Sequence, residues 1–403
     1  IFLEILSLMK RILTGLFFNL IFLTIAIFSI KLIPHLPARY LPILELFPFI
    51  LLLISFVMGI KFNRSLVIFS TILFSLVYAY FFWLPAIGDI HNTLILNSIA
   101  VLLAVNIALI SFYSERGIAT FIGLARFSFI GLQVVVLIWL IGSKNPEWIH
   151  IINMILFPEL KVELLFFSQT ALLSILISLF VVSLSYLYRA NPFRSAIITS
   201  MILVFYAITF PVEEMVSIAI LFSFVMLLPL FTLVSESYRM AYLDELTNLP
   251  GRRALNETLN KLGSKYCIAM LDVDLFKKFN DTYGHDAGDD VLRLLCNKLK
   301  AVSGGGKSFR YGGEEFTVVF PGITAPEAKL HLELLRENIA NNRFMLRKQE
   351  RRTTGKKNST KKNNREVKVT ISIGYAERSE KAKTPDKVLK QADKALYRAK
   401  GNE

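Results

Sequence analysis

Long apolar segments dominate the first 235 residues of the chain and restrict what this part can fold into. A helix needs about 20 apolar residues to cross the hydrocarbon layer of a membrane, since each residue adds about 1.5 Å. Lipid offers the backbone no hydrogen-bond partners, so a chain crosses it as helices or as a closed barrel. We count eight segments of helical length, separated by short stretches that carry Pro, Gly, Asn or charge. The predicted spans are Ile12–Ile33, Ile43–Ile60, Leu66–Ile87, Thr93–Phe112, Ile118–Ile141, Leu164–Tyr188, Ser195–Val212 and Met215–Val234.

The loops between these spans differ in charge. Cytoplasmic loops of membrane proteins retain Lys and Arg, so alternate loops can be compared by their basic residues. The second set of loops has four basic and six acidic residues, and we therefore predict that both termini lie with the basic set, inside the cell. The basic set is Lys10, Arg11, Lys61, Arg64, Arg116, Arg189, Arg194 and Arg239.

The spans carry few ionisable side chains, and no inverted repeat is visible in them. Both observations weigh against a transporter. We expect instead a module that contacts membrane lipid and receives a signal, through a sensory ligand that the sequence does not identify.

The composition changes near residue 235. The whole chain is 54% hydrophobic, with a mean hydropathy of +0.52, whereas nearly all Asp residues follow this point. We therefore divide the chain into a membrane domain at residues 1–235 and a soluble domain at residues 236–403, and expect the last membrane helix to continue through Tyr238 to Met240. The two cysteines, Cys267 and Cys296, fall in apolar stretches, which favours buried side chains over a disulfide framework.

Much of the net charge of +14 is local. Residues 343–368 contain eleven basic and two acidic residues, which accounts for nine of the fourteen charges. A segment so poor in apolar residues is expected to form a mobile basic insertion. It is either a solvated loop or a surface attracted to anionic inner-leaflet lipid. No nucleic-acid-binding motif accompanies the charge, so we do not expect a nucleic acid partner.

A buried strand at Tyr266–Leu271 is predicted to end in the acidic run Asp272-Val273-Asp274. Carboxylates at the end of such a strand suit Mg²⁺, which prefers oxygen ligands shared with substrate phosphates. Further along, a hairpin is predicted at Phe309–Phe320, with Gly312-Gly313 at its tip because glycine tolerates tight turns. Glu314 and Glu315 follow the tip. An acidic pair by itself is usually structural, but together with the strand-end acid it indicates metal-assisted phosphoryl transfer.

Ordered motifs in the soluble half carry a family resemblance. From about Leu243 to its end the chain resembles the GGDEF-domain diguanylate cyclases. The resemblance implies an α+β, cyclase-palm-like domain with a central, mostly antiparallel sheet, following a multi-pass α-helical membrane domain. The motifs are Asp244–Thr247, Asp272–Asp281, Gly284–Asp289, Arg310–Phe316, Ile371–Gly374 and Ala392–Lys400.

The resemblance also implies roles for single residues. Asp272 and the Val273 carbonyl, with Glu314 and Glu315, would bind Mg²⁺, or Mn²⁺ as an alternative. Glu314 is the favoured base and Glu315 the favoured metal ligand, although the sequence leaves their division of labour open. The implied substrate-binding residues are Asn280 and Asp289 for guanine, Lys277 and Lys400 for phosphates, His285 in the nucleotide pocket, and Arg310.

The family reaction joins two GTP molecules into cyclic di-GMP and releases two pyrophosphates. Each domain holds one GTP, so a homodimer is implied, in the inner membrane of a bacterium with the soluble domain in the cytoplasm. The alternative from another class is a catalytically inactive receptor that binds GTP or cyclic di-GMP. Such receptors typically lose the acidic turn and keep a product site, whereas this chain shows the opposite pattern.

Three departures from the family pattern are visible. The stretch Ser303–Phe309 lacks the Arg-x-x-Asp product-inhibition site, so we predict no feedback inhibition through it. The turn before the first helix has Asn248 and Gly251 where the family usually has Gly and Asn, and both residue types tolerate left-handed backbone. An arginine often found a few residues after the position of Lys400 has no counterpart, which puts one phosphate contact in doubt.

Overall fold

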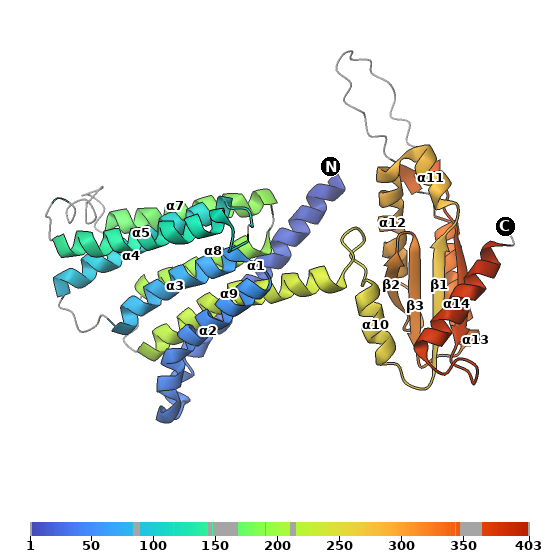
Figure 1. Ribbon diagram of the computed structural model, residues 1–403, viewed down its shortest axis with the longest axis horizontal. Coiled ribbons are helices and arrows are strands. Elements are labelled where there is room, and N and C mark those ends of the chain that lie inside the picture. The colour runs from blue at the N-terminus through green and yellow to red at the C-terminus, as the bar shows by residue number, and fades with distance from the viewer. Residues whose placement is uncertain are drawn as a thin grey trace, which may run out of the picture. The chain divides into compact units, whose positions relative to one another are not determined.

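A computed structural model describes residues 2–83, 89–115, 117–143, 147, 168–189, 191–209, 215–342, 344–346 and 365–401. The chain divides into two compact units, Ile1–Ser237 and Tyr238–Glu403 (Figure 1), close to the boundary expected from composition. Each unit has a hydrophobic core of its own.

The first unit consists of helices. Seven of its described helices are long and apolar enough to cross a membrane. The apolar part of another, Pro192–Ala207 in α8, is shorter, so the seventh predicted span, Ser195–Val212, stays a prediction and ends outside the described residues. The helices are α1 (Phe2–Ile30), α2 (Leu41–Lys61), α3 (Ser65–Trp83), α4 (Asp89–Phe112), α5 (Phe121–Ser143), α7 (Gln169–Arg189), α8 (Pro192–Thr209) and α9 (Met215–Tyr242), with short 3₁₀ turns at Ile33–His35 and Ala38–Tyr40.

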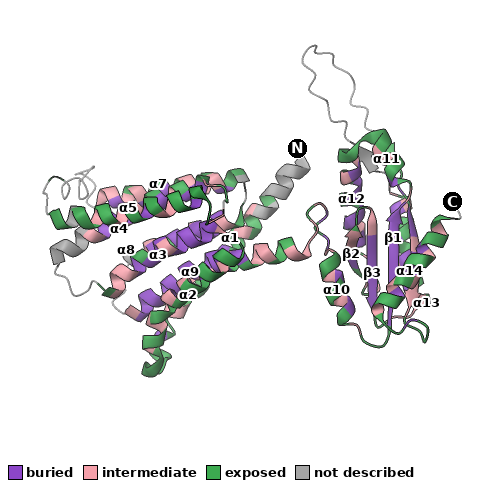
Figure 2. Cartoon of the chain, viewed as in Figure 1, coloured by how far each residue is buried: buried purple, intermediate pink, exposed green. Residues whose placement is uncertain are grey.

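Burial separates inner helices from outer ones (Figure 2). In both α3 and α9, 67% of the apolar span is buried within the protein, against 6% in α5 and 11% in α1. Phe121 and Ile138 of α5 are exposed large apolar side chains. Such side chains are unfavourable in water but suit contact with lipid tails, as a multi-pass membrane unit requires.

Helix α9 runs without interruption to Tyr242, past Tyr238, Arg239 and Met240. The prediction that the last membrane helix continues through these residues is therefore confirmed.

The second unit contains a four-stranded antiparallel sheet in the order β2-β3-β1-β6. The strand β1, predicted from its apolar run, is buried at all eight of its residues and lies in the middle of the sheet. The elements are α10 (Arg252–Asn260), β1 (Tyr266–Val273), α11 (Phe276–Tyr283), α12 (His285–Leu299), β2 (Lys307–Gly312), β3 (Glu315–Pro321), α13 (Ala325–Ala340), β4 (Phe344–Leu346), β5 (Arg365–Val367), β6 (Ile371–Glu377) and α14 (Pro385–Lys400).

Helices cover both faces of this sheet, which explains why β1 is apolar throughout rather than alternating. Cys267 and Leu271 of β1 belong to a core shared with α12 and α13, whereas Ile268 packs with α10. Met270, on the same face as Ile268, packs against α14. The expected α+β fold with an antiparallel sheet is confirmed, and both cysteines are fully buried, as predicted.

The ends of the basic insertion differ from the prediction. Strand β4 pairs with β5 in a two-stranded antiparallel ladder, so residues 344–346 and 365–367 of the predicted loop at 343–368 are strands. Backbone hydrogen bonds pair these two short strands with each other, which their charged composition did not suggest. Residues 347–364 lie outside the described residues.

Candidate active site

Strand pairing brings the predicted acids together. In the antiparallel register between β1 and β3, Asp272 is the partner of Glu315, and on the other side of β1 it is the partner of Ser372. The side chain of Asp272 is only 7% exposed. The sheet therefore fixes two carboxylates side by side at the end of its central strand.

Helix α14 completes the site with charged side chains. Asp393, Tyr397 and Lys400 follow at intervals of four and three residues, so they share one face of the helix. They line an open cavity of about 630 Å³ together with Asp272 and Glu315. The Lys400 ammonium forms an ion pair with Asp272, with 2.6 Å between Nζ and Oδ1.

The clustered acids affect one another. Burial raises the pKa of Glu315 above its ordinary value, and the neighbouring carboxylates of Asp272 and Asp393 raise it further, while Lys400 lowers it. Burial also raises the pKa of Asp272, against the opposing effect of Lys400. Carboxylates that repel each other in this way attract a cation.

A glycine of β6 lets α14 approach the sheet closely. A Cβ atom on Gly374 would lie 1.9 Å from the backbone nitrogen of Leu396 and 2.4 Å from the carbonyl oxygen of Ala392. Any side chain here would push the helix away, and with it Lys400. Gly374 therefore determines where the cationic part of the site lies.

The residues predicted to read guanine lie on two neighbouring helices. Asn280 of α11 presses against Gly288 of α12, since a Cβ atom on this glycine would lie 1.9 Å from the Asn280 Oδ1 atom. Asp289 is the next residue of α12, so the structure brings the two predicted readers close together. The Asn280 Oδ1 atom is buried without a hydrogen-bond partner. A buried acceptor in this state favours a donor from a ligand.

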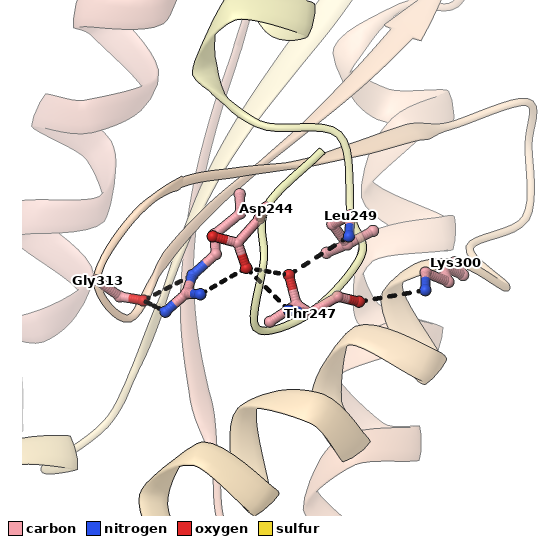
Figure 3. A network of polar contacts seen from close by, with 6 residues as sticks. Asp244, Thr247, Leu249, Lys300 and Gly313 are labelled. Atoms are coloured by element: carbon pink, nitrogen blue, oxygen red, sulfur yellow. Dashed lines mark hydrogen bonds and ion pairs between the residues drawn. The ribbon is translucent and has the colours of Figure 1, made fainter. Parts of the chain in front are cut away.

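Arg310 holds the acidic turn through hydrogen bonds to Gly313, and Figure 3 shows the polar network that joins Gly313, Asp244 and Thr247. The Arg310 guanidinium donates two hydrogen bonds to the Gly313 carbonyl oxygen, at 3.0 and 2.7 Å, and forms an ion pair with Asp244 at 2.6 Å. Asp244 in turn accepts hydrogen bonds from the backbone N–H and the hydroxyl of Thr247. Gly313 has a φ of +49°, as a tight glycine turn requires.

This network links the turn to the segment that follows α9. Burial alone would raise the pKa of Asp244, but the hydrogen bonds from Thr247 and Arg310 lower it overall. Asn248, in the same segment, has a φ of +51°, a left-handed backbone that Asn tolerates. Gly251 is extended, with a φ of −88°.

The carboxylate oxygen atoms of Asp272 and Glu315 suit Mg²⁺, which prefers oxygen ligands. Oδ1 of Asp272 and Oδ1 of Asp274 are buried and make no hydrogen bond of regular geometry. Within the described residues, no three His, Cys, Asp or Glu side chains are arranged around a metal position. A cation held by the Asp272 and Glu315 carboxylates would need further oxygen atoms from the backbone, phosphates or water.

The loop where the family often has its product site is closed onto α13. The Ser303 hydroxyl lies 2.8 Å from Nδ1 of His331. A Cβ atom on Gly304, whose φ is +70°, would lie 2.3 Å from the His331 ring.

The structure thus separates the predicted residues into groups. Asp272, Glu315 and Lys400 line one cavity, with Val273 at the end of the same strand and Glu314 in the adjoining turn. His285 and Lys277 are exposed at the start of α12 and on α11, and Arg310 braces the turn. Sequence reasoning gave no role to Asp244, Asp393, Tyr397 or Gly374. For Asp393 and Tyr397, helical spacing relative to Lys400 was an available signal.

Comparison with known proteins identifies the second unit. The family model described as "Diguanylate cyclase, GGDEF domain" matches residues 241–356 and 346–403. The probable diguanylate cyclase DgcT of Escherichia coli is 35% identical over 181 residues, which is 42% of this chain and 36% of that protein. This chain thus spans about a third of that relative's length.

A second relative extends beyond this domain. The uncharacterized membrane protein SERP0413 of Staphylococcus epidermidis is 30% identical over 240 residues, covering 57% of this chain and 59% of that protein. The crystal structure of the GGDEF domain of DgcB from Caulobacter crescentus in complex with c-di-GMP has 33% identity and a TM-score of 0.34, and covers 40% of this chain and 89% of that one.

The family match coincides with the unit that holds the paired acids, the glycine turn and the antiparallel sheet. The apolar helices before it and the membrane-protein relative indicate a multi-pass membrane protein. The chain therefore carries a GGDEF domain of the diguanylate cyclase family at residues 241–403, preceded by a helical membrane module.

Proposed function

We propose that the chain is an active diguanylate cyclase, which condenses two GTP molecules into cyclic di-GMP and two pyrophosphates. The observation that carries the proposal is the pairing of Asp272 with Glu315 in one strand register, beside a cationic Lys400 in the same cavity. Acids clustered at the cost of mutual repulsion are more typical of a catalytic site than of a site that only binds a nucleotide.

In the proposed reaction, the 3′-oxygen of one GTP bonds to the α-phosphorus of the other. The bond from that phosphorus to the bridging oxygen breaks, and pyrophosphate leaves with the electron pair. Glu314, at the turn, takes the proton of the 3′-hydroxyl. Glu315 and Asp272 would hold Mg²⁺, or Mn²⁺, which when bound polarises the phosphoryl group and neutralises the leaving group. In a second, equivalent step the 3′-oxygen of the other GTP bonds to the α-phosphorus of the first. This step closes the ring and releases the second pyrophosphate.

The substrate contacts follow the placement of the remaining residues. Asn280 has a buried acceptor ready for a guanine N–H, and Asp289 beside it accepts a second. Lys400 and Lys277 supply positive charge for phosphates, and His285 borders the nucleotide. We assign Arg310 the task of holding the turn, since its guanidinium contacts Gly313 and Asp244.

Two sites must face each other to make a cyclic product, so we propose a homodimer in the inner membrane, with the GGDEF domain in the cytoplasm where GTP is found. The membrane module would set the geometry of the pair in response to its ligand, through the continuous helix α9.

The test uses purified full-length protein with labelled GTP or ATP and Mg²⁺, followed by product chromatography. We expect cyclic di-GMP from GTP alone, and none from Glu315→Ala or Asp272→Ala. Glu333→Ala, which removes an exposed carboxylate of α13, serves as the matched control and should retain activity. Undiminished product from either site variant would refute the assignment, and nucleotide binding without product would favour the receptor.

A further inference from the structure

The ion pair between Lys400 and Asp272 is asymmetric. Asp272 has a side chain only 7% exposed and is held by backbone pairing on both sides of β1. Removing a carboxylate from water is costly unless a positive charge compensates it. In this structure the ammonium of Lys400 supplies that charge.

Lys400, by contrast, is free to move. Its side chain is 40% exposed, and it is the last residue of α14. Lysine has a flexible four-carbon stem and a compact charge that accepts partners from many directions. The acid is therefore fixed, whereas its cation can leave.

The buried carboxylate and the flexible cation are in contact at one oxygen atom of Asp272. Oδ1 of Asp272 lies 2.6 Å from the ammonium, has almost no exposed surface and makes no hydrogen bond of regular geometry. A divalent cation bound to the same oxygen would lie close to the ammonium and repel it, because both are positively charged and little water screens them at a buried atom. Lys400 and a metal thus compete for the same place.

Resting on the proposed function, we infer that Lys400 is a placeholder for the divalent cation at Asp272 and makes metal binding depend on the nucleotide. A metal arriving alone must break the ion pair and leave the ammonium without a partner. A metal arriving with a triphosphate offers the displaced ammonium a phosphate oxygen instead. The site then takes up metal and nucleotide cooperatively, and the acids remain compensated while the site is empty.

The experiment measures Mn²⁺ binding by electron paramagnetic resonance, with and without a non-hydrolysable GTP analogue, on the full-length protein in detergent. Without nucleotide, we expect Lys400→Met to bind Mn²⁺ at least tenfold more tightly than the wild type. The increase in Mn²⁺ affinity that the GTP analogue causes in the wild type should be mostly lost in this variant. Lys400→Arg keeps the ion pair and should resemble the wild type.

Removing any positive charge near a metal site tightens cation binding to some extent. Lys394→Met is therefore the matched control, because Lys394 lines the same cavity on the same helix. We expect it to change Mn²⁺ affinity less than threefold. An equal effect of Lys394→Met and Lys400→Met, or no tightening by Lys400→Met, would overturn the inference.

A stability measurement guards against misfolding. The two cysteines are both buried in the GGDEF domain, so a thiol-reactive fluorophore reports thermal opening of this domain alone. In metal-free buffer, Lys400→Met should open at a lower temperature than the wild type, and Mn²⁺ should restore its midpoint. A lowered midpoint that Mn²⁺ leaves unchanged would count against the inference. None of these readouts needs turnover, so they remain decisive even if the wild type makes no cyclic di-GMP.

Discussion

Replacing Gly374 by alanine tests whether close packing of α14 on β6 sets the geometry of the site. The added Cβ atom would lie 1.9 Å from the nitrogen of Leu396, about 1.5 Å short of the 3.4 Å at which ordinary contact begins, and the atoms it meets are helix backbone. Overpacking costs about 1–3 kcal/mol when side chains can adjust. Since no rotamer change relieves this contact, we expect a loss of at least about 3 kcal/mol.

For a domain of this size, that loss corresponds to a midpoint lower by about 6–12 °C. Thermal labelling of the two buried thiols in the full-length protein measures it. Helix α14 carries Lys400, and a displacement of about 1 Å at a catalytic site can lower its rate about 100-fold, so cyclic di-GMP formation should fall by a similar factor.

Gly263→Ala is the matched control. Gly263 is exposed, has no left-handed backbone, and a Cβ atom there would meet no atom within 4 Å. Its midpoint should stay within about 2 °C of the wild type. If Gly374→Ala shows an equally small change, the close approach of helix and strand does not constrain the domain, and our account of how Lys400 is positioned is wrong.

Three other predictions concern separate features. In Arg310→Lys one ammonium cannot bridge Asp244 and the turn, so the free energy of unfolding should fall by about 1.5–3 kcal/mol, measured by thermal labelling of the thiols. Because the pKa of Asp244 is already lowered, this loss should be equal at about pH 6 and about pH 8. A pH-dependent loss would contradict the prediction. Burial raises the pKa of Cys267 and Cys296 to about 12, so neither thiol should react in the native protein, and rapid labelling at room temperature would argue against the packed core. The raised pKa of Glu315 means that this group is protonated, and its cation-binding form lost, at a higher pH than an ordinary Glu. Mn²⁺ affinity should therefore fall as the pH is lowered, beginning at a higher pH than an ordinary Glu would give. The same pH dependence in Glu315→Gln would show that another group is responsible.

Sequence patterns predicted the elements of the GGDEF domain better than their contacts. The apolar run of β1 and the glycine turn each have a local signature, and both form where expected. Arg310 and Asp244 are far apart in sequence, and no periodicity reveals that they form an ion pair. The close packing of Gly374 on α14 likewise depends on tertiary structure.

In the membrane unit, composition predicted helices but not their partners. An apolar span reads the same whether lipid or protein surrounds it, so α3 and α5 look alike in sequence although the first is mostly buried and the second mostly exposed. In the basic insertion, composition failed to predict two short strands. Its charge suggested a loop throughout, yet short backbone pairing needs few apolar residues.

The ladder of β4 and β5 makes the domain suitable for engineering. Leu346 and Arg365 are paired across it, so the two ends of the intervening segment are already adjacent. The entropy of closing a loop grows only with the logarithm of its length, and doubling it costs about 0.6 kcal/mol. The intervening residues could therefore be exchanged for a reporter module of much greater length, such as a fluorescent protein, while the sheet that carries the acids keeps its connections.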